Sequence, residues 1–164
     1  IGTGVGVGVW VNGGLLHGML HPEGGHVFLP RHPKDPEGGI CPYHKNCLEG
    51  FASGPAIEAR WGKKAVELVD RPEVWELESY YIAQALVDYI LVLSPQKIIL
   101  GGGVMHQEQL FPMIRANVLE MLNGYINTEE LGDMDNYIVP ASLKDNQGIM
   151  GCIKLGLNAL NASR

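Results

Sequence analysis

The sequence has little positive charge, few cysteines and no long hydrophobic run. Its 164 residues include 12 Lys and Arg against 18 Asp and Glu, which gives a formal net charge of −6 without any basic cluster. That balance argues against nucleic acid and against an anionic membrane as partners. No uninterrupted apolar run reaches the roughly 18 to 20 residues that span a bilayer, and no signal peptide opens the chain. We therefore expect a cytoplasmic protein.

The composition is that of a globular protein, because 46% of the residues are hydrophobic. A chain of this length can bury a core as one domain or as one lobe of a larger protein. Residue 1 is isoleucine instead of an initiator methionine, and it lies directly before a glycine-rich motif that a strand normally precedes. We therefore expect the sequence to begin inside a domain.

The sequence contains three cysteines, and two of them lie in its most informative stretch. Cys41, His44 and Cys47 have the spacing Cys-x2-His-x2-Cys, so one tight turn can point all three side chains at a common centre. These donors suit zinc, whose tetrahedral structural sites need a fourth ligand. His26 precedes the turn and can supply that ligand. We therefore expect a zinc-binding loop over residues 26–50.

Other interpretations of this stretch remain open. Cys41 and Cys47 could form a disulfide, His44 could be a surface residue, and His26 could be a core histidine with a backbone partner. A disulfide would leave Cys152 unpaired, and a loop rich in Pro, Gly and His has little apolar content to hold its shape otherwise. Both points favour zinc.

The 22 glycines are clustered along the chain. In residues 1–11 glycine alternates with small and β-branched residues, which predicts a strand with one bare face. Asn12-Gly13 is a strong hairpin signal, and residues 14–18 would form the second strand. A bare face can bring a phosphate close to backbone N–H groups, and Thr3 adds a hydroxyl there. The alternative is a glycine-rich edge hairpin that binds no ligand.

The rest of the chain alternates short apolar runs with helical periodicity. The pattern predicts helices over 55–61, 73–93, 107–122 and 147–160, and short strands at 27–29, 97–100 and 137–140. Short buried strands joined by long helices pack as a sheet covered by helices, and the hairpin adds antiparallel strands to it. The expected fold class is therefore α/β, with a mixed sheet covered by helices.

Three motifs follow one another in a fixed order: Gly2-Thr3-Gly4, then Glu23-Gly24-Gly25-His26 with the turn from Cys41 to Glu49, then Gly101-Gly102-Gly103. Together they resemble the ROK family of sugar kinases, and histidine at position 44 most resembles the bacterial fructokinases of that family. The resemblance covers essentially the whole chain. It implies an actin-like, ribonuclease-H-like fold in which residues 1–164 form the C-terminal lobe. It also implies ATP-dependent phosphorylation of a hexose, D-fructose to fructose 6-phosphate.

The resemblance further implies roles for individual residues. Glu23, His26 and Glu49 would hold sugar hydroxyls, and the zinc ligands would be His26, Cys41, His44 and Cys47. ATP would bind as its Mg²⁺ complex. Its phosphates would contact Gly2, Thr3 and Gly4, and its adenosine would lie along Gly101, Gly102, Gly103, Val104 and Met105. Pro55, beside the hinge, would be a further nucleotide contact. Carboxylates are strong acceptors for hydroxyl protons. The alternative for Glu23 and Glu49 is a pair of solvated surface carboxylates.

The sequence offers no candidate catalytic base. Kinases use an aspartate to accept the hydroxyl proton, and in the ROK family it belongs to the N-terminal lobe, which we expect to be a partner of this chain. The chain alone is therefore expected to be inactive. Two other functions remain open, a sugar-responsive ROK transcriptional regulator and a zinc-stabilised domain without a ligand. Because related kinases usually dimerise, we also expect a homodimer.

Overall fold

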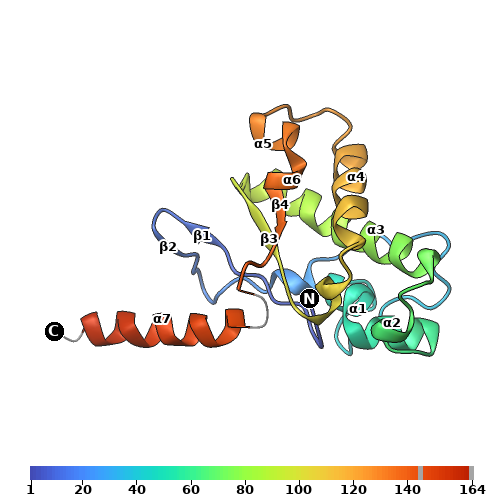
Figure 1. The fold of residues 1–164 in the computed structure, drawn as a ribbon, viewed down its shortest axis with the longest axis horizontal. Helices are drawn as coiled ribbons and strands as arrows, with labels where there is room; N and C mark the ends of the chain where they lie inside the picture. The colour runs from blue at the N-terminus through green and yellow to red at the C-terminus, as the bar shows by residue number, and fades with distance from the viewer. Residues whose placement is uncertain (144–145, 163–164) are drawn as a thin grey trace.

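The computed structural model describes residues 1–143 and 146–162, in which helices pack around one core and a single helix extends away from it (Figure 1). The α-helices are α1 Leu48–Ala52, α2 Gly54–Trp61, α3 Pro72–Leu93, α4 Leu110–Leu122, α5 Glu129–Gly132, α6 Met134–Tyr137 and α7 Gln147–Ala162. The strands are β1 Trp10–Val11, β2 Gly14–Leu15, β3 Ile98–Leu100 and β4 Ile138–Pro140, and the 3₁₀ turns are η1 Gly24–His26, η2 Ala65–Glu67 and η3 Gly103–His106.

Helix α3 is the centre of the core. It begins at Pro72, whose fixed φ suits a first helical turn, and it ends where Ser94 adopts a left-handed conformation. Trp75 and Tyr81 are fully buried on this helix, and the Trp75 indole donates a hydrogen bond to the carbonyl of Leu68. Helices α1 and α4 pack against it. The predicted helix over 73–93 is confirmed.

The other predicted helices also form, with small differences at their ends. Ser53 caps α2 by accepting a hydrogen bond from the Ala56 backbone, and Pro55 lies in the first turn, as the sequence indicates. Helix α4 begins at Leu110, three residues later than predicted, because residues 107–109 form the turn between η3 and the helix. The predicted helix over 147–160 is α7.

The strands are shorter than expected and form two separate pairs. Asn12 and Gly13 both have positive φ and turn β1 antiparallel to β2, while β3 runs parallel to β4 with Ile98 opposite Ile138. Both strand directions occur, as in a mixed sheet, but within the described residues the pairs are not joined. Strand β3 was expected to be buried, yet the side chain of Ile99 is exposed.

Two predicted strands are wrong over most of their length. Residues 1–8 pair with no other strand in the described part of the chain, and residues 27–29 contribute only a single bridge, from Phe28 to Cys47. A strand requires a hydrogen-bonded neighbour, which a sequence pattern cannot supply. The backbone N–H of Val5 instead donates a hydrogen bond to the side-chain carboxylate of Glu49.

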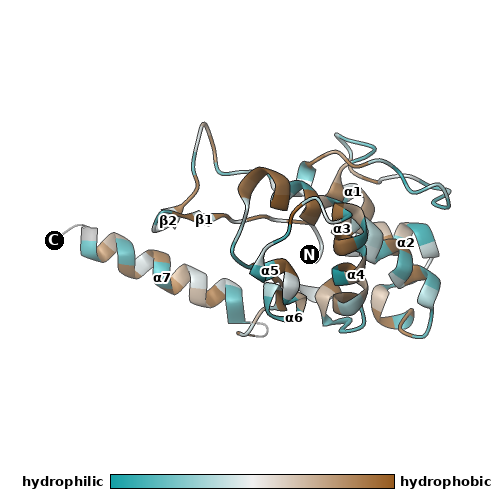
Figure 2. Cartoon of the chain, turned by 90° about the horizontal axis from the view of Figure 1, so that it is seen from above, coloured by the Kyte–Doolittle hydropathy of each residue, from teal (hydrophilic) through white to brown (hydrophobic). Residues whose placement is uncertain are grey.

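Helix α7 carries large apolar residues that the rest of the structure does not cover. Figure 2 shows apolar and polar residues alternating along it, and Figure 1 shows it extending on the same side of the molecule as the β1–β2 hairpin. The exposed apolar residues are Ile149, Met150, Ile153, Leu155, Leu157 and Leu160. Within residues 1–143 and 146–162, no helix is both long enough and apolar enough to cross a membrane.

A buried ion pair fixes the loop between residues 30 and 40. Asp35 receives hydrogen bonds from the Arg60 guanidinium at 3.1 Å and from the Tyr81 hydroxyl at 2.7 Å. Burial by itself raises the pKa of the Asp35 carboxyl, but the Tyr81 hydrogen bond and the Arg60 charge together hold that pKa below its usual value. Arg60 also donates twice to the carbonyl of Phe51, so the pair connects this loop to α1.

We predict that Asp35→Asn lowers the free energy of unfolding by about 3–5 kcal/mol, because it leaves the Arg60 guanidinium buried without a charge partner. Chemical denaturation of the full-length protein measures the change. Glu73→Gln is the matched control, because it neutralises a carboxylate whose ion pair with Arg71 lies on the surface. An equal loss of stability in both variants would contradict the prediction that the buried pair stabilises the protein more than the surface pair does.

Candidate metal and ligand site

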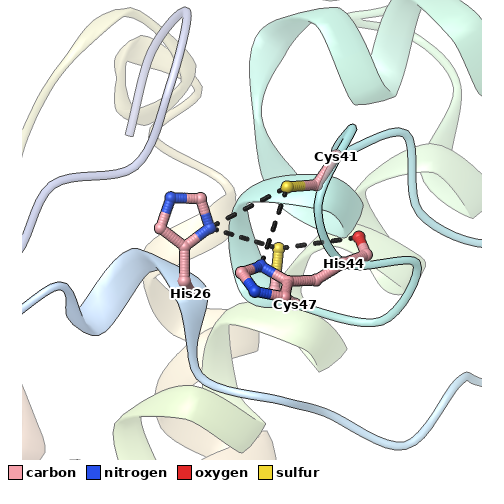
Figure 3. Close-up of side chains that lie close together, drawn as sticks. All are labelled: His26, Cys41, His44 and Cys47. Carbon is pink, nitrogen blue, oxygen red and sulfur yellow. Dashed lines mark hydrogen bonds between the residues drawn. The ribbon is translucent and has the colours of Figure 1, made fainter.

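Four potential metal ligands lie together, at the positions that the sequence predicts. The donor atoms of His26, Cys41, His44 and Cys47 all lie within 4.8 Å of one another. Nδ1 of His26 lies 3.6 Å from the Cys47 sulfur and 3.9 Å from the Cys41 sulfur, and Nδ1 of His44 lies 3.8 Å from the Cys41 sulfur. Figure 3 shows the four side chains pointing toward one centre. The four donors could therefore hold a single metal ion.

Two separate segments supply the four donors. His26 ends the 3₁₀ turn η1, whereas the other three donors lie in the turn that leads into α1. Backbone hydrogen bonds join the segments, from Leu48 to the carbonyl of Val27 and from Leu29 to the carbonyl of Asn46. The donors are therefore brought together by contacts between the backbones of the two segments.

The alternative of a disulfide is not realised, because Cys41 and Cys47 are both free thiols. Burial opposes the thiolate of Cys41, yet hydrogen bonds from backbone groups of His44 and Tyr43 lower its pKa below the ordinary value. Burial raises the pKa of the Cys47 thiol, which also caps α1 by accepting a hydrogen bond from the Gly50 backbone. Cys152 lies on the surface, away from this cluster.

Glu49 connects the metal cluster to the glycine-rich segment. Its Oε2 accepts a hydrogen bond of 2.9 Å from the Val5 backbone, and its Oε1 lies 3.9 Å from Nε2 of His26. A Cβ at position 4 would lie 2.7 Å from Oε2, so any larger residue there would displace this carboxylate from its present position. Gly4, predicted as a phosphate contact, therefore also has a packing role that the sequence pattern did not indicate.

Glu23, the other predicted sugar-binding carboxylate, is exposed. Its Oε1 lies 2.9 Å from Nε2 of His21, and its backbone carbonyl accepts a hydrogen bond from the backbone of His26. Glu23 thus belongs to the turn that carries His26, but its carboxylate pairs with His21 instead of with the metal cluster. The partner His21 was not singled out in the sequence, although it lies only two residues before Glu23.

The three segments predicted to bind nucleotide meet in the structure. The backbone N–H of Gly54 donates to the carbonyl of Gly2, and the backbone N–H of Val104 donates to the carbonyl of Ile1. Gly102 has a φ of 96°, and a Cβ there would lie 2.4 Å from the carbonyl oxygen of Ile1, so both conformation and contact require glycine. The start of the chain, the start of α2 and the glycine triplet thus form one junction.

The residues at this junction differ in what they could offer a ligand. Thr3, Pro55, Gly102 and Gly103 are exposed, whereas the side chains of Val104 and Met105 are buried in the core. Those two residues could therefore meet a nucleotide through their backbone only. Their hydrophobic character, which the sequence displays, is explained by packing.

Comparison with known proteins identifies relatives along almost the whole chain. The sequence matches the ROK family over residues 1–159. It is 57% identical over 163 residues to a Bacillus subtilis (strain 168) protein that carries a provisional fructokinase name, and 50% identical over 161 residues to a fructokinase of Pediococcus pentosaceus. These alignments cover 99% and 98% of this chain but 54% of each relative. The chain therefore spans about half the length of the curated relatives it matches.

Solved structures agree with this assignment at the level of the fold. A ROK hexokinase from Thermus thermophilus superposes with a TM-score of 0.74 at 24% identity, covering 92% of this chain and 53% of that protein. A ROK family glucokinase from Streptomyces griseus, in complex with glucose and AMPPNP, gives a TM-score of 0.70 at 22% identity, covering 94% of this chain and 58% of that protein. The α/β fold of ROK sugar kinases, implied by the motifs, is thereby confirmed. The chain belongs to the ROK family.

Proposed function

We propose that the intact protein transfers the γ-phosphoryl group of Mg²⁺-ATP to a hydroxyl of a hexose, with D-fructose as substrate and fructose 6-phosphate as product. The observation that carries this proposal is the connection of Glu49 to the four-donor cluster. Relatives named fructokinase, which match nearly the whole chain, support the choice of fructose. A sugar-responsive regulator is less well supported, because these relatives are enzymes by name.

The metal that fits the cluster best is zinc. Zinc binds sulfur at about 2.3 Å and imidazole nitrogen at about 2.0–2.1 Å, so tetrahedral geometry separates a sulfur and a nitrogen ligand by about 3.6 Å. Three of the four sulfur–nitrogen pairs in the cluster lie at 3.6, 3.8 and 3.9 Å, and all four donors lie within 4.8 Å of one another. Since all four positions would be filled by protein, zinc would have a structural role: it would hold the turn that carries Glu49.

The pair of His26 and Glu49 provides a site for a sugar hydroxyl. The distance of 3.9 Å between Nε2 and Oε1 is longer than a direct hydrogen bond. Because Nδ1 faces the sulfurs, Nε2 would carry a proton, so a hydroxyl placed at both atoms could accept from His26 and donate to Glu49. Glu23 would be a second carboxylate acceptor, supplied by the same turn as His26.

The nucleotide would bind where the first residues of the chain meet Gly54 and the glycine triplet. Exposed Thr3 and the backbone N–H groups around Gly102 would face the phosphates and the adenosine, with Mg²⁺ bound through the phosphates. The aspartate that accepts the hydroxyl proton would come from an N-terminal lobe, and this chain would form the C-terminal lobe. A homodimer and a cytoplasmic location remain predictions.

The uncovered apolar surfaces support the presence of that second lobe. Helix α7 and the β1–β2 hairpin extend to the same side of the molecule in both views (Figures 1 and 2). Both carry exposed apolar residues, which on the hairpin include Trp10 and Leu15. The curated relatives are about twice the length of this chain. A further lobe packed on this side would bury the apolar residues and supply neighbours for the unpaired segment at residues 1–8.

We predict that the intact protein phosphorylates D-fructose when supplied with Mg²⁺ and ATP. Product formation from a panel of hexoses, followed through ADP release in a coupled assay, tests this. Phosphorylation of another hexose but not of fructose would contradict the proposed substrate. No phosphorylation of any hexose would refute the proposed kinase activity. The 164-residue chain alone serves as the control and is expected to be inactive.

Zinc removal provides a separate prediction. The intact protein is expected to contain one zinc ion per chain by elemental analysis, and Cys41→Ser should lose it while the surface variant Cys152→Ser retains it. Acidification should weaken zinc binding, because protons compete for the two thiolates. A chelator should increase hydrogen exchange in residues 26–50. Full retention of zinc by Cys41→Ser would contradict the proposed ligand set.

Glu49→Gln tests the sugar contact. The variant can keep its hydrogen bond with the Val5 backbone, but it loses the charged acceptor for a hydroxyl proton. We expect the KM for the hexose to rise about 10- to 100-fold, as for the loss of a hydrogen bond to a charged group. Glu58→Gln, on the exposed side of α2, is the control and should leave KM unchanged. Similar KM values in both variants would contradict the proposal that Glu49 binds the sugar.

A further inference from the structure

Helix α3 donates three hydrogen bonds to the segment that carries His26 and leads to the cysteine turn, and its Tyr81 hydroxyl also accepts one of 3.0 Å from the backbone of His32. The Tyr81 hydroxyl donates to the Asp35 carboxylate at 2.7 Å, and the Gln84 amide donates to the carbonyl of Pro30 at 3.4 Å. The Tyr89 hydroxyl donates to the carbonyl of Gly24 at 2.7 Å. All three donors lie on one side of the helix, given their spacing along it. A single rigid element therefore holds this segment at three points.

The Tyr89 bond acts directly on the turn that presents His26. The carbonyl of Gly24 also accepts a hydrogen bond of 3.1 Å from the backbone of Val27, and that bond closes η1. Burial, with a smaller contribution from the charge of Asp88, raises the pKa of Tyr89 to about 12. The hydroxyl therefore stays protonated, and remains a donor, throughout the neutral range.

The glycine-rich segment contacts the same turn. A Cβ at Gly24 would lie 2.8 Å from the side chain of Val7, and a Cβ at Gly25 would lie 1.9 Å from the carbonyl oxygen of Val5. The backbone of η1 thus lies against residues 5–7 as closely as glycine permits, while its Gly24 carbonyl is held by α3. These contacts leave the turn little freedom, and the orientation of the His26 ring depends on it.

We propose that Tyr89 is a positioning residue: through the carbonyl of Gly24 it orients η1 so that His26 presents Nδ1 to the sulfurs and Nε2 to Glu49. The proposal rests on the metal and sugar site described above. It assigns a function in the site to a tyrosine that touches neither metal nor sugar. The alternative is that the hydroxyl only contributes to the packing of α3.

The test compares Tyr89→Phe with Tyr80→Phe in the full-length protein. Phenylalanine keeps the ring at position 89 in the core, where the tyrosine is partly buried. Tyr80 lies on the same helix, and its hydroxyl makes no hydrogen bond to the described residues, so Tyr80→Phe is the matched control. Zn²⁺ affinity is measured by competition with a chromophoric chelator, and the geometry of the site by the visible absorption of the Co²⁺-substituted protein.

The expected result is a zinc dissociation constant about 3- to 10-fold higher in Tyr89→Phe, as for the loss of one hydrogen bond. The cobalt bands should change with it, while Tyr80→Phe stays like the wild type. Wild-type zinc affinity and an unchanged cobalt spectrum in Tyr89→Phe, or equal changes in both variants, would overturn the positioning role of Tyr89. The metal site itself would not be contradicted by that outcome. Wild-type protein that binds no Zn²⁺ would overturn the metal site itself and the inference with it.

Discussion

The burial of α3 is the constraint on which the rest of the structure depends. Trp75, Tyr81 and Ile82 are almost completely buried along this helix, and a fully buried large apolar side chain contributes about 1.5–3 kcal/mol. The segments that form the candidate site are attached to it: α1 packs against it, Tyr81 holds the loop at Asp35, and Tyr89 holds the turn at Gly24. The metal cluster therefore lies on a support that apolar burial stabilises independently of any ion.

The glycine-rich motifs have two separate physical causes, which a sequence pattern cannot distinguish. Gly103 is exposed at the junction of three segments, and a Cβ there would meet no protein atom within 4 Å, so a ligand could reach the backbone. Gly25, in contrast, lies where a Cβ would clash with the carbonyl oxygen of Val5, so its missing side chain lets two segments of the protein pack together. Clustered glycines thus indicate close approach, and the partner can be a ligand or the chain itself.

The sequence predicted the local features well because their causes are local. Helix boundaries follow from caps and periodicity, as at Ser53 for α2, and the ligand spacing from Cys41 to Cys47 places three donors on one turn. The unpaired state of residues 1–8 could not be predicted, because strand formation depends on a neighbouring segment. Nor could the buried pair of Asp35 and Arg60, whose members are 25 residues apart and carry no motif.

His26 shows how a structural metal could affect sugar recognition in this arrangement. One of its ring nitrogens faces two sulfurs, and the other faces the carboxylate of Glu49. A metal ion on Nδ1 would fix the tautomer of the ring, so the proton would have to reside on Nε2. The metal ion would also withdraw electron density from the ring and make that N–H a stronger hydrogen-bond donor. A zinc ion would then contribute to the proposed sugar contact through one imidazole. A disulfide between Cys41 and Cys47 would hold the turn equally well, but it could not control the His26 proton. This difference gives a physical reason for placing histidine and cysteine together in one turn.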